Sequence, residues 1–173
     1  MRPFLPVFVL AAAALAGCAR EGAAPDAVSG KAATARDAYV QAAALSDQYE
    51  IQSSQLARSR AQRPEVRDYA QMMIDHHTQS TEQLWAAARA AGMVRTHVWM
   101  LPPEGVKMME DLGKAYGADF DRLYLRQQVQ AHEAALALHG GYAANGDAPA
   151  LRAVAAAAVP VVTQHLERAR ALD

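Results

Sequence analysis

The chain has 173 residues, with 17 Lys and Arg against 18 Asp and Glu, and a single cysteine. This length suits one domain with a substantial core and leaves little room for two. The balanced charge and the lack of a basic block argue against a nucleic-acid partner. Because the sequence has no Gly-rich phosphate loop, nucleophile elbow or His-Glu-x-x-His motif, it gives no support to a nucleotide-dependent or hydrolase function.

The first 34 residues are typical of an export and anchoring segment. Arg2 precedes an apolar run that is too short to span a bilayer, which predicts a signal peptide over residues 1–17. The ending Leu15-Ala-Gly-Cys18 resembles a bacterial lipobox, so we expect Cys18 to be lipidated and to become the mature N-terminus. An ordinary signal peptide with a chance cysteine is the alternative. Residues 18–34, rich in Ala, Gly, Pro and Ser, predict a flexible tether after the lipidated cysteine.

The expected anchor also predicts where the protein resides. Ala19 follows Cys18, and the absence of Asp at that position fits, by analogy with lipoprotein sorting, delivery to the outer membrane facing the periplasm. We expect membrane contact through the lipid alone, because removal of residues 1–17 takes away Arg2 and leaves a net charge near −2. Since Cys18 is the only cysteine, the mature chain has no disulfide, and its stability must come from packing.

From residue 35 onward the sequence predicts helices only. The Ala-rich chain shows no strand-like alternation and is interrupted at Ala61–Pro64, Gly92–Pro103, Gly117 and Asn145–Pro149. We therefore expect one domain over residues 35–173, with four main helices at about 35–60, 64–91, 119–144 and 148–172 and a shorter one at about 104–116. The predicted fold class is all-α, a four-helix bundle with one extra short helix in the crossover.

Several residues predict how these helices begin, end and bend. Pro64 suits a first helical turn, Gly92 a C′ position, and Asp119 an N-cap. Pro160 lies inside the last helix and is expected to kink it. On the first helix the apolar face is predicted to consist of Ala38, Ala42, Leu45, Tyr49 and Leu56.

An adjacent pair, His76-His77, lies within the amphipathic stretch Tyr69–Trp85. At about 100° per residue, His77 falls near the centre of the apolar stripe and His76 falls on its flank. A buried imidazole needs a hydrogen-bond partner or a metal. The other three main helices carry Glu50, His132 and His165 on their inward faces, and the helical rise of about 1.5 Å per residue places all of them near the middle of the bundle.

Two interpretations of this layer are open. In the first, a transition metal (Zn, Fe, Mn or Cu) is bound non-catalytically at a site built by Glu50, His77, His132 and His165. The imidazoles would ligate the metal, and Glu50 would supply charge or a hydrogen bond to a histidine. Four further residues would then lie beside the site or behind its ligands: His76, Asp121, Tyr124 and Gln128. In the second, the same residues form a metal-free buried polar network in a structural or interaction module.

Other functions have less support in the sequence. A small redox enzyme would need an open coordination position and a second carboxylate-rich helix, and the sequence shows neither clearly. The lack of a Glu-x-x-His motif disfavours a di-iron oxidase or an iron store. His97 and His139 are expected to be ordinary residues, and the methionines are expected to fill the core rather than to bind Cu(I).

Four stretches occur in a characteristic order: Glu50, Pro64–Thr78, Phe120–Tyr124 leading to His132, and Pro160 followed by His165-Leu166. This pattern resembles the family called domain of unknown function 4142 over nearly all of the chain from about Tyr39. The resemblance implies a ferritin-like, exported bundle, often at the outer membrane, and implies no activity. In the family pattern an Asp-His pair stands where this chain has His76-His77. The run Met73-Ile-Asp-His-His77 is more weakly similar to domain of unknown function 305, which implies copper or silver handling.

Overall fold

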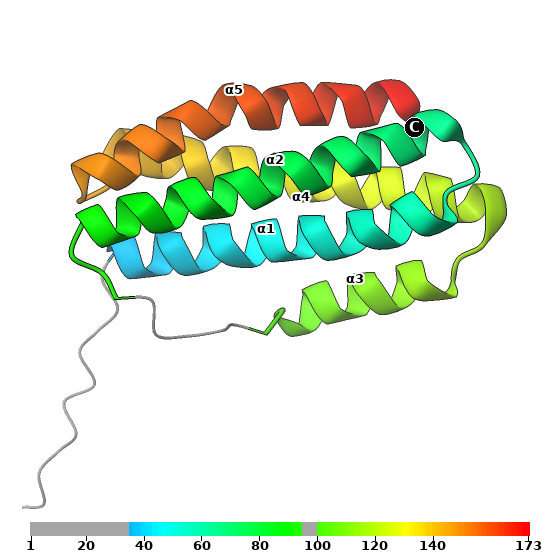
Figure 1. Ribbon diagram of the computed structural model, residues 1–173, viewed down its shortest axis with the longest axis horizontal. Coiled ribbons are helices and arrows are strands. Elements are labelled where there is room, and N and C mark those ends of the chain that lie inside the picture. Colours follow the sequence, from blue (N-terminus) through cyan, green and yellow to red (C-terminus); the bar gives the residue numbers. More distant parts are fainter. Residues whose placement is uncertain (1–34, 95–99) are drawn as a thin grey trace, which may run out of the picture. The chain divides into compact units, whose positions relative to one another are not determined.

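The computed structural model describes residues 35–94 and 100–173, and the regular secondary structure of these residues is entirely helical. In chain order, the helices are α1 (Ala35–Arg60), α2 (Pro64–Ala90), α3 (Pro103–Lys114), α4 (Gly117–Asn145) and α5 (Pro149–Leu172) (Figure 1). The predicted all-α class is therefore confirmed for the described residues, and the predicted helix limits differ from these by no more than two residues. The signal peptide, the tether with Cys18, and His97 lie outside the described residues.

The four long helices lie side by side, and each packs against two of the others. α1 packs along α2 and α4, and α5 packs along the same two helices on their other side. Contacts between Tyr39 and His139, and between Ser54 and Tyr124, show that α1 and α4 are antiparallel. Short turns make α2 antiparallel to α1, and α5 antiparallel to α4. As a result α1 and α5 run in one direction, and α2 and α4 run in the other.

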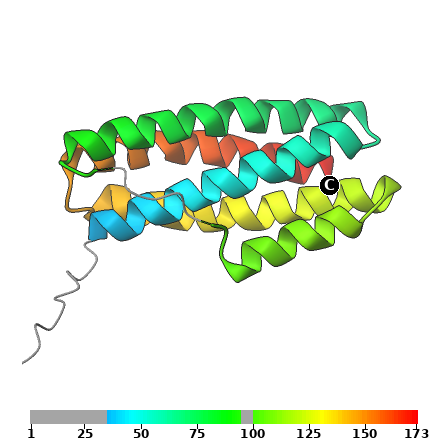
Figure 2. The same cartoon turned by 60° about the horizontal axis from the view of Figure 1, so that its bottom comes forward.

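Because α2 and α4 are parallel, the chain between them returns along the length of the bundle, and α3 lies within this crossover. α3 packs on the outside of α1 and α4 (Figure 2). Arg60 at the end of α1 donates hydrogen bonds to the carbonyl oxygens of Gly113 and Ala115, at 2.9 and 2.8 Å. The side-chain amide of Gln127 on α4 donates to the carbonyl of Met108 at 3.0 Å. α3 is thus held by side chains from both neighbouring helices.

Most of the predicted helix signals are confirmed, and one is wrong. Pro64 lies in the first turn of α2, and Gly92 follows α2 with a φ of +77°, a conformation that L-residues rarely adopt. α4, however, begins at Gly117, whose φ is +61°, and has no side-chain N-cap. Asp119 lies inside the first turn, where its carboxylate pairs with Arg122. The prediction of Asp119 as N-cap missed that Gly117 itself makes the turn from α3 into the helix.

α5 contains Pro160 in its interior and bends along its length (Figure 1). Proline has no N–H to bond the carbonyl four residues earlier, and its ring crowds that carbonyl, so a helix bends at such a position. Among the helices of residues 35–94 and 100–173, none combines the length and apolar character that crossing a membrane requires.

The core consists of two apolar clusters with polar residues between them. One cluster contains Tyr39, Leu84 and Leu151, and the other contains Tyr69 and Phe120. Between the clusters lies what we call the polar layer, made of the buried residues Asp47, Glu50, Ser53, His77, Gln128, His132 and His165. Each long helix contributes to it, as the sequence predicted for the middle of the bundle.

The predicted apolar face of α1 is correct for Tyr49, which is buried, and for Leu56, which packs against the core, but it is wrong at its N-terminal end. Ala38 and Ala42 are exposed, and Leu45 is only partly buried. Ala42 and Leu45 line a groove beside α3, which explains why this side of α1 carries apolar residues without facing the core. The side of α1 that does face the core carries several polar residues, among them Asp47 and Glu50.

Candidate metal centre

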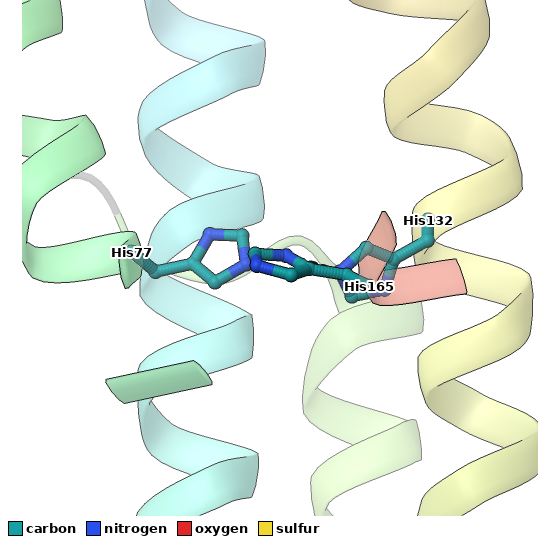
Figure 3. Close-up of side chains that lie close together, drawn as sticks. All are labelled: His77, His132 and His165. Atoms are coloured by element: carbon teal, nitrogen blue, oxygen red, sulfur yellow. Dashed lines mark hydrogen bonds between the residues drawn. The ribbon is translucent and has the colours of Figure 1, made fainter. Parts of the chain in front are cut away.

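Three buried histidines converge in the polar layer from three different helices. His77 on α2, His132 on α4 and His165 on α5 are 7%, 1% and 1% exposed. Each offers one ring nitrogen such that all three nitrogens lie within 4.8 Å of one another (Figure 3). Imidazole nitrogens are common ligands of transition metals, so this trio could hold a metal ion.

A carboxylate on α1 holds the ring of His77 in place. Nδ1 of His77 donates to Oδ1 of Asp47 at 2.8 Å, and the Thr81 hydroxyl donates to Oδ2 of Asp47 at 3.0 Å. Burial lowers the pKa of His77, but the hydrogen bond to Asp47 and the charges of Glu50 and Asp47 outweigh it, so the pKa is raised overall. Nε2 of His77 is buried and has no hydrogen-bond partner within residues 35–94 and 100–173.

His132 is oriented by its own helix. Its Nδ1 donates to the backbone carbonyl of Gln128 at 2.7 Å, and Oε1 of Glu50 lies 3.7 Å from the same nitrogen. This leaves Nε2 of His132 directed at Nδ1 of His165, at 3.3 Å. Glu50 therefore lies behind His132, on the side away from the other two rings of the trio.

His165 lies between two further imidazoles. Its Nε2 is 2.8 Å from Nδ1 of His76, and the two rings are stacked with centroids 5.1 Å apart. Burial, followed by the proximity of His77, His132 and His76, lowers the pKa of His165 to about 2. His165 is therefore neutral at physiological pH and keeps a lone pair available on one ring nitrogen.

The hydrogen bonds of the trio leave one nitrogen of each ring facing the others. The other, outward nitrogen of each ring already has a partner. Nδ1 of His77 bonds the Asp47 carboxylate, Nδ1 of His132 bonds a backbone carbonyl, and Nε2 of His165 bonds the imidazole of His76. In a tetrahedral site, two ligand nitrogens that each lie about 2.05 Å from the metal are about 3.3 Å apart. Nε2 of His132 and Nδ1 of His165 are separated by this same distance, 3.3 Å. Partners behind metal-binding histidines have this same role in known metal sites, where they fix the ring orientation.

The charges of the layer also favour a cation. Asp47 and Glu50 are buried, and none of the Lys and Arg side chains in the described ranges is. A buried carboxylate is costly unless it is paired with a positive charge or well hydrogen-bonded. Oε2 of Glu50, Nε2 of His77 and Oε1 of Gln128 are the buried side-chain atoms of the described residues that lack a hydrogen-bond partner, and all three belong to the polar layer.

The remaining residues predicted for the site lie around the trio or away from it. Gln128 donates to the Ser53 hydroxyl at 3.1 Å within the layer, whereas Tyr124 bonds Ser54 at 2.8 Å. Asp121 accepts hydrogen bonds from the backbone N–H groups of Gln62 and Arg63, at 3.0 and 2.9 Å. Asp121 thus holds the turn between α1 and α2 rather than a histidine of the trio.

Sequence reasoning missed one contributor. Asp47 was not singled out, although it lies three residues before Glu50, so that both occupy one side of the same helix. His139, which was expected to be ordinary, lies outside the trio. It is buried, its Nδ1 is 3.0 Å from the Tyr39 hydroxyl, and burial lowers its pKa.

A cavity of about 370 Å³ reaches the site between α2 and α5. Its inner end includes His76, His77 and His165 together with Asp47. The α5 wall is apolar, formed by Val154, Ala157, Ala158, Val161 and Val162, whereas α2 contributes the polar side chains of Gln79, Ser80 and Gln83. Since Gln79, Gln83 and Val161 are exposed, the cavity opens at the surface of the bundle.

Comparison with known proteins gives one match. The family model described as "Domain of unknown function (DUF4142)" matches residues 21–172, which include all five described helices. Neither the curated proteins nor the solved structures contain a match to the chain. The resemblance to this family predicted from the sequence is confirmed, and the weaker similarity to domain of unknown function 305 stays a prediction.

Proposed function

The chain belongs to the family described as domain of unknown function (DUF4142), and since that description names no activity, we propose a function from the site itself. The protein binds one transition-metal ion through His77, His132 and His165, and serves metal handling or stress tolerance rather than catalysis. The observation that carries this proposal is that three buried imidazole nitrogens lie within 4.8 Å of one another, and that Nε2 of His77 has no hydrogen-bond partner among the described residues.

The donor set narrows the choice of metal among Zn, Fe, Mn and Cu. Three imidazoles suit zinc, copper and iron, whereas manganese favours carboxylate and water ligands. Glu50 is not part of the trio's cluster of ligand atoms, so its role is to offset the charge of the cation from behind His132. A divalent ion would balance the two negative charges of Asp47 and Glu50.

We further propose that the arrangement is a ferritin-like four-helix bundle. Its support is the direction of the helices, with one crossover along the bundle between α2 and α4, which is the connection typical of ferritin-like folds. The polar layer also lies where such bundles place their metals, between facing helices. Histidine replaces most of the carboxylates that a di-iron site would need.

The proposed location is the bacterial cell envelope, with Cys18 lipidated and the bundle tethered to the outer membrane, facing the periplasm. Support comes from the lipobox-like run Leu15–Cys18 and from Ala19 after it. Mass spectrometry of the protein purified from membranes tests this directly. A diacylglyceryl-modified N-terminal Cys18 is the expected result, and an unmodified chain beginning elsewhere would contradict it.

Metal binding is tested on the full chain purified in detergent, by elemental analysis after dialysis against each metal and by thermal unfolding with and without chelator. We expect one ion per chain. Binding at a concentration 100 times the dissociation constant stabilises a fold by about 2.7 kcal/mol, so chelator should lower the melting temperature. His132→Gln should abolish stoichiometric binding, and His139→Gln, which changes a buried histidine outside the trio, should not.

A metal-free structural or interaction module is the second candidate. The favouring observation is that each histidine of the trio already has a hydrogen-bond partner on its outward nitrogen. In that case no metal would be retained in stoichiometric amount, chelator would leave the melting temperature unchanged, and His77→Ala would destabilise the protein equally with and without added metal.

A further inference from the structure

We propose that a metal held by the trio keeps an open coordination position facing the cavity between α2 and α5, and that a small neutral nitrogen-donor molecule binds there. This inference rests on the proposed metal binding and adds a ligand class to it. The cavity and the three histidines then form a single binding site.

The trio supplies three ligands, and the other side chains of the described part of the chain supply no fourth. Among the described residues, the group of potential ligands consists of His77, His132 and His165. The two oxygens of Asp47 accept hydrogen bonds from Nδ1 of His77 and from the Thr81 hydroxyl, so they are already engaged. Glu50 lies behind His132, away from the other two rings. Zinc sites with three protein ligands leave a fourth position for an exogenous ligand, whereas structural sites are closed by four.

The cavity determines the direction in which that position opens. His77 and His165 line its inner end, but His132 does not, so His132 holds the metal from the side opposite the cavity. A molecule entering between α2 and α5 would reach the metal between the two lining rings. The volume of about 370 Å³ is within the range that holds small organic ligands.

Charge and polarity select the ligand. A divalent ion with Asp47 and Glu50 gives a layer with no net formal charge, and an anionic ligand would add a buried negative charge. Among the residues that the structure describes, no Lys or Arg side chain lines the cavity to offset that charge. The valines and alanines of α5 suit the body of an apolar ring, and the hydroxyls of Ser46 and Ser80, which also line the cavity, can accept a hydrogen bond from an N–H group of the ligand. Imidazole, a neutral ring with one donor nitrogen and one N–H, has these properties.

The test uses the full chain in detergent, loaded with Co²⁺ as a coloured substitute whose visible absorption reports the coordination sphere. Imidazole is titrated while equilibrium dialysis monitors the bound cobalt, and azide is titrated in parallel as the anionic competitor. We expect imidazole to change the absorption bands with cobalt retained, and azide to bind more weakly.

Two variants locate the position in the cavity. Ala158→Leu places a larger side chain in the cavity from its α5 wall, and it should weaken imidazole binding at least about tenfold. Ala156→Leu, an exposed alanine of the same helix that does not line the cavity, should leave it unchanged. Should Ala158→Leu fail to fold, Val161→Phe fills the cavity from its exposed rim and is expected to weaken binding in the same way.

The inference is overturned if the spectrum of bound cobalt does not respond to imidazole, if the cavity-filling variants bind imidazole as the wild type does, or if azide binds more tightly. In each of these outcomes cobalt is still bound by the trio, so the proposed function stands. If no cobalt is bound, the proposed function and this inference fail together.

Discussion

His165 shows how the polar layer is organised at the scale of one residue. Without metal, Nδ1 of His132 carries its proton, because that nitrogen bonds a backbone carbonyl. His165 can then donate from Nδ1 to His132 and accept at Nε2 from His76. A metal on Nδ1 of His165 requires the proton on Nε2 instead, and His76 would become the acceptor. His76 is thus the residue that permits this change of tautomer.

Asp47 should determine how tightly the metal is held, because it orients His77 and makes the ring more basic. Asp47→Asn is expected to weaken metal binding about 10- to 100-fold without changing the stoichiometry, as is typical when a partner behind a ligand is lost. Competition with a chromophoric chelator measures the affinity. Asp121→Asn, a second buried carboxylate that bonds only the α1–α2 turn, is the control and should keep the wild-type affinity.

The pH dependence of stability in the metal-free protein should report on His165. Its pKa is lowered from 6.5 to about 2 in the folded state, so the unfolded chain takes up a proton below pH 6.5 that the folded chain does not. Stability from this residue is complete above pH 6.5 and falls as the pH falls, by about 1 kcal/mol between pH 6.5 and 5.5. His77 acts oppositely, because its raised pKa gives stability at low pH that is lost as the pH rises.

Urea unfolding in the presence of chelator, repeated at both pH values, isolates this contribution. His165→Gln removes the titrating ring and should reduce the loss of stability between pH 6.5 and 5.5 by about 1 kcal/mol relative to the wild type. An identical loss in the two proteins would show that His165 is protonated as readily in the folded chain as in the unfolded one.

At the scale of the elements, alanine substitutions at Gly117 and Gly113 form a matched pair of tests. Gly117 has a φ of +61° at the start of α4, so Gly117→Ala should destabilise the fold by about 1–2 kcal/mol. Gly113 lies within α3 without a positive φ and has open space around the position of a Cβ. Gly113→Ala should therefore be neutral or stabilise by up to about 1 kcal/mol. Thermal unfolding measures both, and equal effects would contradict the assignment of the turn to Gly117.

The sequence predicted the helices well, since Pro64 and Gly92 mark helix ends by local chemistry that needs no tertiary information. It failed for Ala38 and Ala42 on the predicted buried face of α1, because hydrophobic periodicity cannot distinguish a face that meets the core from one that meets α3. Asp47 was missed for a related reason. A carboxylate on a helix is usually exposed, and its partnership with His77 depends on the register of α1 against α2, which the sequence of either helix does not contain.

At the scale of the whole molecule, the crossover allows the trio to form. With α2 and α4 parallel and α5 antiparallel to both, mid-helix residues of all three reach one level between the two apolar clusters. The sequence predicted this common level for His77, His132 and His165 from their distances along the helices. It also predicted that Glu50 would supply charge or a hydrogen bond to a histidine, but not that this histidine would be His132, because that depends on how α1 is rotated about its axis.

The most direct test of the central claim, that His77, His132 and His165 bind one metal, is X-ray absorption at the edge of the bound metal in the loaded full chain. For zinc we expect a first shell with three imidazole nitrogens at about 2.0–2.1 Å, and the imidazole scattering should diminish in His132→Gln. A first shell of oxygen ligands alone, or a spectrum unchanged by His132→Gln, would contradict the assignment of the site.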